Sequence, residues 1–219
     1  MLIQFTNDQS YVWSEFTLED MEDHSYWVFD VEATGIDAAT EQVTQIGGVR
    51  VAGSQADFTS TFVSYVRPNK PIPQKIQTLT GITPEQTETA PVFAEAFPRF
   101  LERCRGHILV TQCGYEFDYP LLETECRRCG LIFPDFIRLD TKAFFAFLHP
   151  ELDQTFSTDF LVSYYALDTA GLNRHDALGD ALLTSLIFCA ELADARKQGL
   201  TAIKLAQPIT IKRFQLPPL

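Results

Sequence analysis

The chain has 219 residues, of which 46% are hydrophobic and 12% aromatic, and it carries a formal net charge of −12. This composition is typical of a globular domain with a full core and excludes wholesale disorder. No apolar run approaches the roughly 20 residues of a membrane span, and the N-terminus lacks the pattern of a signal peptide, so we expect a cytoplasmic protein.

The negative charge is unevenly distributed. Residues 1–24 contain six acidic side chains and no Lys or Arg, so this segment supplies half of the net charge. We interpret it as an acidic N-terminal extension. Net acidity argues against tight, sequence-independent binding to a nucleic-acid duplex, but not against metal-dependent chemistry on a phosphate.

Alternating and apolar stretches predict the strands of one sheet. The predicted strands cover residues 26–31, 42–51, 58–66, 107–111 and 135–139. A short turn at Gly53 joins the second and third strands and indicates an antiparallel hairpin. The first strand is almost wholly apolar, as in a strand that is buried on both faces.

Helices separate and follow the later strands. They are predicted over residues 74–79, 92–101, 119–129, 141–148, 158–165 and 176–197, and a further helix start is predicted at Thr83. The order predicts one α/β domain over residues 25–198, with a mixed five-stranded sheet flanked by helices on both faces. We expect the first three strands to be antiparallel and the last two to run parallel to the first.

Two acids, Asp30 and Glu32, end the first strand before a Thr-Gly turn. Because side chains alternate along a strand, these two carboxylates point to the same side. They would repel each other unless a cation lies between them. The alternative is a pair of solvated acids at a strand end.

Three further residues stand at element ends. Asp118 lies where the fourth strand has given way to a helix, and Asp180 lies one turn into the long last helix, five residues after His175. Taken singly, Asp118 could be only a helix N-cap, Asp180 could pair with an arginine, and His175 could be a surface histidine. Together with the first pair they match the parts of a two-metal phosphodiester hydrolase, because Mg²⁺ prefers carboxylate oxygens and water.

The motifs resemble those of the DnaQ-like 3′–5′ exonucleases, the DEDDh branch of the RNase H-like superfamily. The first motif is matched by Phe29-Asp30-Val31-Glu32-Ala33-Thr34-Gly35, the second by Phe117-Asp118 and the third by His175 to Asp180. The resemblance covers residues 26–195. It also includes Leu79-Thr80-Gly81-Ile82-Thr83 and Asp140-Thr141.

The resemblance implies a role for each matched residue. Asp30, Glu32, Asp118 and Asp180 would hold two Mg²⁺ ions, for which Mn²⁺ can substitute, and His175 would be the general base. Ala33, Thr34 and Gly35 would receive the terminal nucleotide of a single-stranded DNA or RNA 3′ end. The products would be nucleoside 5′-monophosphates.

One departure concerns the substrate. Many members carry His-Asn shortly before the second-motif aspartate, where this chain has Cys113-Gly114. A side chain expected near the 3′-terminal nucleotide is therefore missing. Other features, including Tyr65-Val66-Arg67-Pro68, resemble the RNA-trimming Eri-like members somewhat more than the polymerase proofreaders.

Two other functions fit parts of the pattern. A catalytically silent nucleic-acid-binding or partner-binding protein could keep the fold, although silent relatives usually lose an acid. A metal-dependent endonuclease could share the same sheet. After Asp194 the chain has five basic residues and no acids. We expect a basic tail over residues 199–219 that packs loosely on the domain; it could also bind nucleic acid, a protein partner or the acidic N-terminus.

Overall fold

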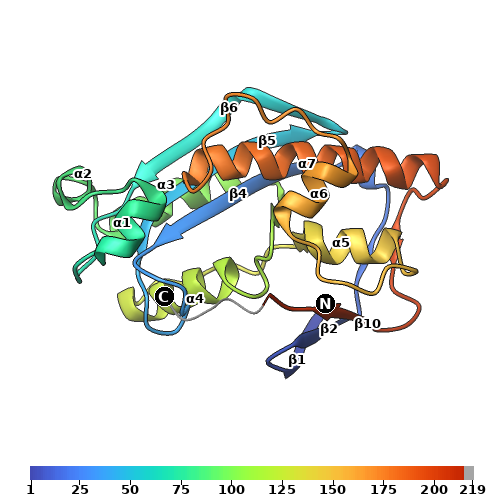
Figure 1. Ribbon diagram of the computed structural model, residues 1–219, viewed down its shortest axis with the longest axis horizontal. Helices are drawn as coiled ribbons and strands as arrows, with labels where there is room; N and C mark the ends of the chain where they lie inside the picture. Colours follow the sequence, from blue (N-terminus) through green and yellow to red (C-terminus); the bar gives the residue numbers. More distant parts are fainter. Residues whose placement is uncertain (215–219) are drawn as a thin grey trace.

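A computed structural model describes residues 1–214 of the chain (Figure 1). Its central sheet has five strands in the order β6-β5-β4-β7-β8. These strands are β4 (Ser25–Ala33), β5 (Val43–Ala52), β6 (Gln55–Tyr65), β7 (Ile108–Thr111) and β8 (Arg138–Asp140). The first three pair in antiparallel fashion, and β7 and β8 run parallel to β4. The predicted mixed sheet is therefore confirmed.

The helices follow the predicted order. They are α1 (Gln74–Thr80), α2 (Pro84–Glu88), α3 (Phe93–Cys104), α4 (Asp118–Cys129), α5 (Thr141–Leu148), α6 (Thr158–Tyr164) and α7 (Ala177–Lys197). Within the described residues, no helix is both long and apolar enough to cross a bilayer.

Alternation along β4 distributes its side chains between two helical layers. Tyr26 packs edge-on against Phe188 of α7, with ring centroids 4.7 Å apart. Phe29 points the other way and contacts Phe100 of α3 and Tyr119 of α4. Helices therefore cover both faces of the sheet. Asp30, one residue after Phe29, lies on the face that α7 covers.

The last strand of the sheet, β8, is shorter than predicted, begins later in the sequence and runs directly into α5. We expected a strand over residues 135–139, whereas β8 covers only Arg138–Asp140. Its partner β7 has only four residues, and the register pairs Leu109 with Arg138 and Thr111 with Asp140. Before Arg138 the pairing is reduced to one backbone hydrogen bond, from the nitrogen of Leu109 to the carbonyl of Ile137 at 2.9 Å.

The two ends of the chain form small sheets with each other. In one sheet, β2 (Ser10–Ser14) lies between β1 (Leu2–Asn7) and β10 (Ile209–Lys212). In the other, β3 (Thr17–Leu18) pairs with β9 (Ile203–Lys204). Tyr11 and Trp13 on β2 are fully buried in the same core as the central sheet.

The expectation of a loosely packed tail is wrong for its described part. Ile203 and Ile211 are buried, and each lies on a strand paired with the N-terminal segment. Lys204 also forms an ion pair with Glu19, Nζ to Oε1, at 3.0 Å. Apolar burial and strand pairing thus hold this segment, and the acidic N-terminus is its intramolecular partner. Residues 215–219 of the predicted tail lie outside the described residues.

Candidate active site

The first acid pair lies at the carboxyl end of β4. In the register with β5, Asp30 stands opposite Gly47 and Glu32 stands opposite Gln45. Gly47 leaves room for the start of α7, since a Cβ there would lie 2.2 Å from the backbone carbon of Ala177. This close approach brings the first turn of α7 over the two carboxylates, both of which are half-buried.

The third acid begins α4 and is almost completely buried. Asp118 is 4% exposed, and its Oδ1 has no hydrogen-bond partner among the described residues. It is not the cap of its helix, because the N-cap position belongs to Phe117. The simple capping role is therefore excluded, and Oδ1 is a buried carboxylate oxygen that no donor satisfies at full hydrogen-bonding geometry among the described residues.

The loop before α4 is fixed by another buried acid. Asp140 is fully buried and accepts hydrogen bonds from the backbone nitrogens of Cys113 at 3.3 Å, Tyr115 at 3.2 Å and Lys142 at 2.9 Å. These bonds connect the end of β8 to the loop that delivers Asp118. They give a structural role to the Asp140-Thr141 motif.

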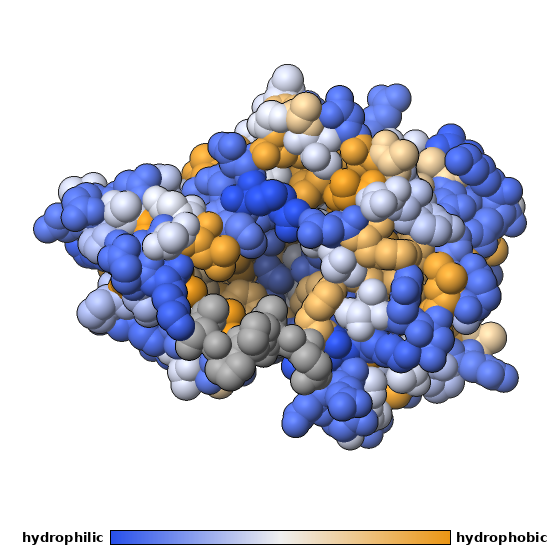
Figure 2. Space-filling view, in the orientation of Figure 1, coloured by the Kyte–Doolittle hydropathy of each residue, from blue (hydrophilic) through white to orange (hydrophobic). Residues whose placement is uncertain are grey.

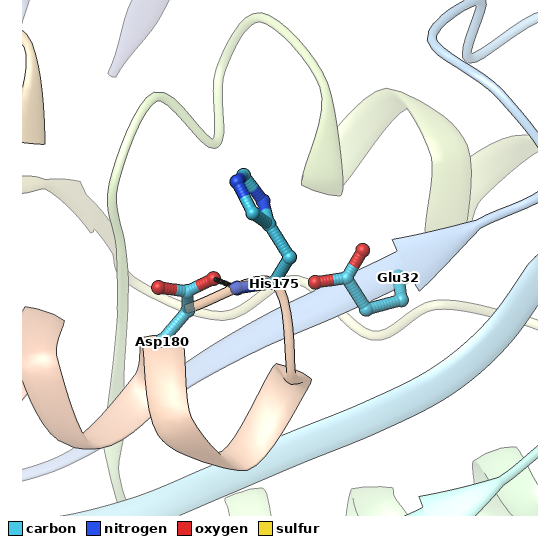
Figure 3. A group of neighbouring side chains, drawn as sticks. All are labelled: Glu32, His175 and Asp180. Carbon is cyan, nitrogen blue, oxygen red and sulfur yellow. Dashed lines mark hydrogen bonds between the residues drawn. The ribbon is translucent and has the colours of Figure 1, made fainter. Parts of the chain in front are cut away.

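His175 and Asp180 meet at the start of α7. The backbone nitrogen of His175 donates to Oδ2 of Asp180 at 2.7 Å, and Nε of Arg174 donates to Oδ1 at 2.9 Å. Figure 3 shows Glu32 pointing from the end of β4 toward these residues. One ligand atom from each of Glu32, His175 and Asp180 lies within 4.8 Å of the others.

Two hydrogen bonds from one side chain tie the start of α7 to β5. Nε2 of Gln45 donates to Oδ2 of Asp176 at 3.0 Å, and Oε1 of Gln45 accepts from the backbone nitrogen of Ala177 at 2.9 Å. The other carboxylate oxygen of Asp176 caps the helix by accepting from Gly179 N at 2.9 Å. Gln45 thus fixes the helix end that carries Asp180.

The acids raise one another's pKa. Burial, with added repulsion from Asp180 and Asp118, raises the pKa of Glu32 to about 8. Burial likewise raises the pKa of Asp118 to about 7. Burial, followed by repulsion from Asp118 and Glu32, raises the pKa of Asp30 well above the usual range. A site of this kind favours a proton or a cation among its oxygens.

The residues fit a divalent metal. The donor set consists of carboxylates, which Mg²⁺ and Mn²⁺ prefer, and Oδ1 of Asp118 is a buried acceptor without a donor among the described residues. Arg174 is the cation that contacts Asp180, and it also pairs with Asp159 at 2.7 Å. Metal binding at Asp180 would compete with this guanidinium.

A cleft with two compartments opens beside the acids, near the hollow at the centre of the face in Figure 2. One compartment, of about 270 Å³, includes Asp180 and Arg174, and the other, of about 570 Å³, includes Asp118. Both are lined by Asp30, Gln112, Cys113 and Phe214. Asp30 therefore lies between the two halves of the site.

The Thr-Gly turn is folded more tightly than the sequence suggested. The backbone nitrogen of Thr34 donates to the Gln42 carbonyl at 2.8 Å, so it is already engaged. Thr34 is 1% exposed, and its hydroxyl donates to Glu41. Ala33, Thr34 and Gly35 line neither compartment of the cleft, and the next residue, Ile36, lines the larger one.

Several lining residues were not predicted. Arg174 could have been considered from its position beside His175. Gln112 has only the proximity of the second motif as a signal, and Phe214 has none, because it lies 34 residues after the last motif aspartate. Its place in the cleft depends on the pairing of β10 with β2.

Comparison with known proteins decides the family. The family model described as "Exonuclease" (RNase_T) matches residues 27–188. The chain belongs to this exonuclease family. The match contains every residue of the predicted site, and it confirms the resemblance to DnaQ-like DEDDh nucleases.

The exonuclease domain also has relatives in sequence and in structure. The chain is 28% identical over 200 residues to the PolC-type DNA polymerase III of Caldanaerobacter subterraneus, covering 91% of this chain and 14% of that protein. It thus spans about a seventh of this relative's length. The predicted lean toward RNA-trimming members receives no support from this match to a DNA polymerase.

Solved structures share the fold at lower sequence identity. The nuclease domain of 3′hExo, a DEDDh family member bound to rAMP, has a TM-score of 0.70 at 19% identity, covering 81% of this chain and 95% of that one. Escherichia coli exonuclease I in complex with a dT13 oligonucleotide has a TM-score of 0.64 at 18% identity, covering 80% and 42%.

Proposed function

We propose that the chain is a metal-dependent 3′–5′ exonuclease that releases nucleoside 5′-monophosphates from single-stranded DNA or RNA. One observation carries this proposal. Four carboxylates from three separate elements gather with a histidine around the end of β4, and burial raises the pKa of three of them, Asp30, Glu32 and Asp118.

Asp30, Glu32 and Asp180 would hold one divalent ion, and Asp30 with Asp118 a second, together supplying charge stabilisation at the scissile phosphate and a more acidic attacking water. His175 follows a loop that ends at this carboxylate cluster, where its imidazole can accept the proton of that water. The chain's own contribution is to place a base beside the acids.

The terminal nucleotide would lie near the exit of β4. Ala33, Thr34 and Gly35 directly follow Glu32, and this position supports their assignment as residues that contact the terminal nucleotide. Because the Thr34 N–H already donates to the Gln42 carbonyl, contacts to the nucleotide would come from Ala33 and Gly35 on either side of it. The exonuclease domain proper would cover residues 25–198, with the paired terminal segments as an addition to it.

The relatives support a nucleic-acid substrate but leave the sugar open. One neighbour binds rAMP and another binds a thirteen-residue oligo-dT, while the sequence relative is a DNA polymerase. Both DNA and RNA are therefore candidate substrates for the same cleft. A catalytically silent binding protein is disfavoured, because every position of the motifs carries the acid or histidine that the reaction needs.

The test is a time course on 5′-labelled single-stranded DNA and RNA with Mg²⁺, Mn²⁺ or EDTA. We expect ladders that shorten from the 3′ end with either metal, nucleoside 5′-monophosphates as products and no reaction in EDTA. The variant Asp118→Asn should lose most activity. The matched control Asp168→Asn changes an exposed aspartate outside the cleft and should retain it.

A circular single strand separates the alternatives. An exonuclease leaves the circle intact, whereas an endonuclease linearises it. Absence of metal-dependent shortening on both linear substrates would exclude the proposed function, and cleavage of the circle would assign the endonuclease instead.

A further inference from the structure

The C-terminal segment forms part of the cleft wall, although it lies outside the matched family domain, which ends at residue 188. We propose that Phe214 stacks on a base of the bound strand near its 3′ end and so contributes to substrate binding. This inference rests on the proposed exonuclease function and adds a contact that this chain's own C-terminal segment supplies.

The path of the chain brings Phe214 to the cleft. Lys212 pairs with Ser10 in the terminal sheet, and the backbone nitrogen of the next residue, Arg213, donates to the Gln9 carbonyl at 2.7 Å. The chain is therefore held by strand pairing up to the residue before Phe214. Figure 1 shows β10 leading toward the region beside α4.

Arg213 ties this segment to the loop that precedes the second motif. Its Nε lies 3.4 Å from Oε2 of Glu116, and its guanidinium lies 4.9 Å from the ring centroid of Phe5. Glu116 also accepts from Nζ of Lys142 at 2.5 Å, and the Lys142 side chain is fully buried. Since such a buried pair resists separation, Glu116 offers Arg213 a fixed partner.

Phe214 itself is positioned by a cation. Nζ of Lys142 lies 4.7 Å from the centroid of the Phe214 ring. A desolvated ammonium over an aromatic ring is attracted by the electron density of its face. The phenyl ring is therefore held from two sides. Arg213 fixes the backbone just before it, and the buried Lys142 contacts its face.

The ring lies where a single strand would pass. Phe214 lines both compartments of the cleft, beside Asp30 in each of them. Under the proposed function, a phosphate bound through a cation at Asp30 would place its neighbouring nucleotides in these two spaces. Aromatic rings in such grooves bind single strands by stacking on bases, whatever the sequence.

The charge of the protein makes stacking more important here. The chain has a net charge of −12, and the acids that line the cleft outnumber its two arginines, Arg174 and Arg213. Attraction between a basic surface and phosphates, which usually drives nucleic-acid binding, is therefore weak. Base stacking does not depend on that attraction.

The experiment compares Phe214→Ala with Phe214→Trp and with a control, Phe58→Ala. Phe58 is a 50% exposed phenylalanine on β6 that lines neither compartment. We expect Phe214→Ala to raise KM for single strands about 5- to 100-fold, with a smaller effect on kcat. Phe214→Trp should restore binding, and Phe58→Ala should resemble the wild type.

Oligonucleotides with one abasic site at each of the last three 3′ positions identify the stacked base. At one position, removal of the base should weaken binding by the wild type but cause no further loss in Phe214→Ala. A purely structural role of Phe214 would give the same loss at every position. That outcome, or an unchanged KM in Phe214→Ala, would overturn the proposal.

Binding is also measured by fluorescence anisotropy in the His175→Ala background with Mg²⁺. This readout does not require turnover, so it tests the Phe214 contact separately from the exonuclease function. If the wild type shortens no strand, the exonuclease function is rejected, and the anisotropy still decides the role of Phe214. A faster reaction in Phe214→Ala would instead show that the C-terminal segment obstructs the cleft, and would also overturn the stacking contact.

Discussion

His175 adopts a left-handed backbone conformation, with φ of 60°. For a residue with a side chain this costs roughly 1–3 kcal/mol, and it persists where surrounding contacts enforce it. Here the backbone nitrogen of His175 gains a hydrogen bond to the carboxylate of Asp180. The conformation therefore connects the proposed base directly to a proposed metal ligand.

The first prediction concerns this histidine. His175→Ala should lower kcat by about 100- to 10,000-fold, the usual range for a lost general base, while Mg²⁺ binding is retained. Single-turnover kinetics and isothermal titration with Mg²⁺ measure the two effects. His175→Asn, which tolerates the left-handed conformation, checks that backbone strain is not the cause. Wild-type turnover in both variants would remove the assignment of the base.

The packing around Gly114 explains why this chain lacks the family's asparagine at that position. A Cβ at Gly114 would lie 1.9 Å from Cγ2 of Thr111, whose side chain is fully buried. An asparagine does not fit there unless β7 ends differently. Cys113 beside it lines both compartments of the cleft, so the site has a thiol where many relatives have an imidazole.

At the scale of elements, the contact between α7 and β5 determines the geometry of the site. Two strand positions create it: Gly47 allows the backbone of the helix to approach, and Gln45 bonds to the first residue of the helix and to its cap. The helix carries Asp180, while the neighbouring strand β4 carries Asp30. A displacement of α7 therefore changes the separation of these two carboxylates.

We expect Gly47→Ala to lower both Tm and kcat. The added methyl group would lie 2.2–2.3 Å from backbone atoms of Ala177 and Leu178, so the helix itself must move. Overpacking of this kind typically costs about 1–3 kcal/mol. Thermal denaturation and the exonuclease time course measure the two effects. A variant with wild-type Tm and turnover would show that the close approach is unimportant.

The sequence was informative where structure is local. Alternation placed Asp30 and Glu32 on one face, and the helix signals around Asp176 located α7 to within one residue. The terminal strands were not predicted, because the pairing of Ser10 with Lys212 has no local signal. For the same reason, no pattern along the chain could place Phe214 in the cleft.

For the whole molecule, the acid cluster links stability to pH and metal. Folding raises the pKa of Asp118 from 3.8 to about 7 and that of Glu32 from 4.5 to about 8. The folded chain then binds more protons than the unfolded chain across this window, so the free energy of unfolding decreases as pH rises through it. A bound cation removes that penalty.

Accordingly, without metal the Tm of the wild type should fall between pH 5 and pH 8 relative to that of Asp118→Asn/Glu32→Gln. Mg²⁺ should raise the wild-type Tm more at pH 8 than at pH 6, because protons compete with the metal for the same oxygens. Scanning calorimetry in EDTA and in Mg²⁺ provides the measurement. Equal pH dependence of the wild type and the double variant in EDTA would contradict the linkage.

The joining of the two ends in one sheet has a consequence for synthesis. Strand β2 emerges from the ribosome early, but its partner β10 follows only when residue 212 has been made. Contacts this distant in sequence form late, after the loop between them has closed. The four acids and the histidine of the site can thus assemble before Phe214 arrives, and the cleft wall is completed only after residue 214 has been made.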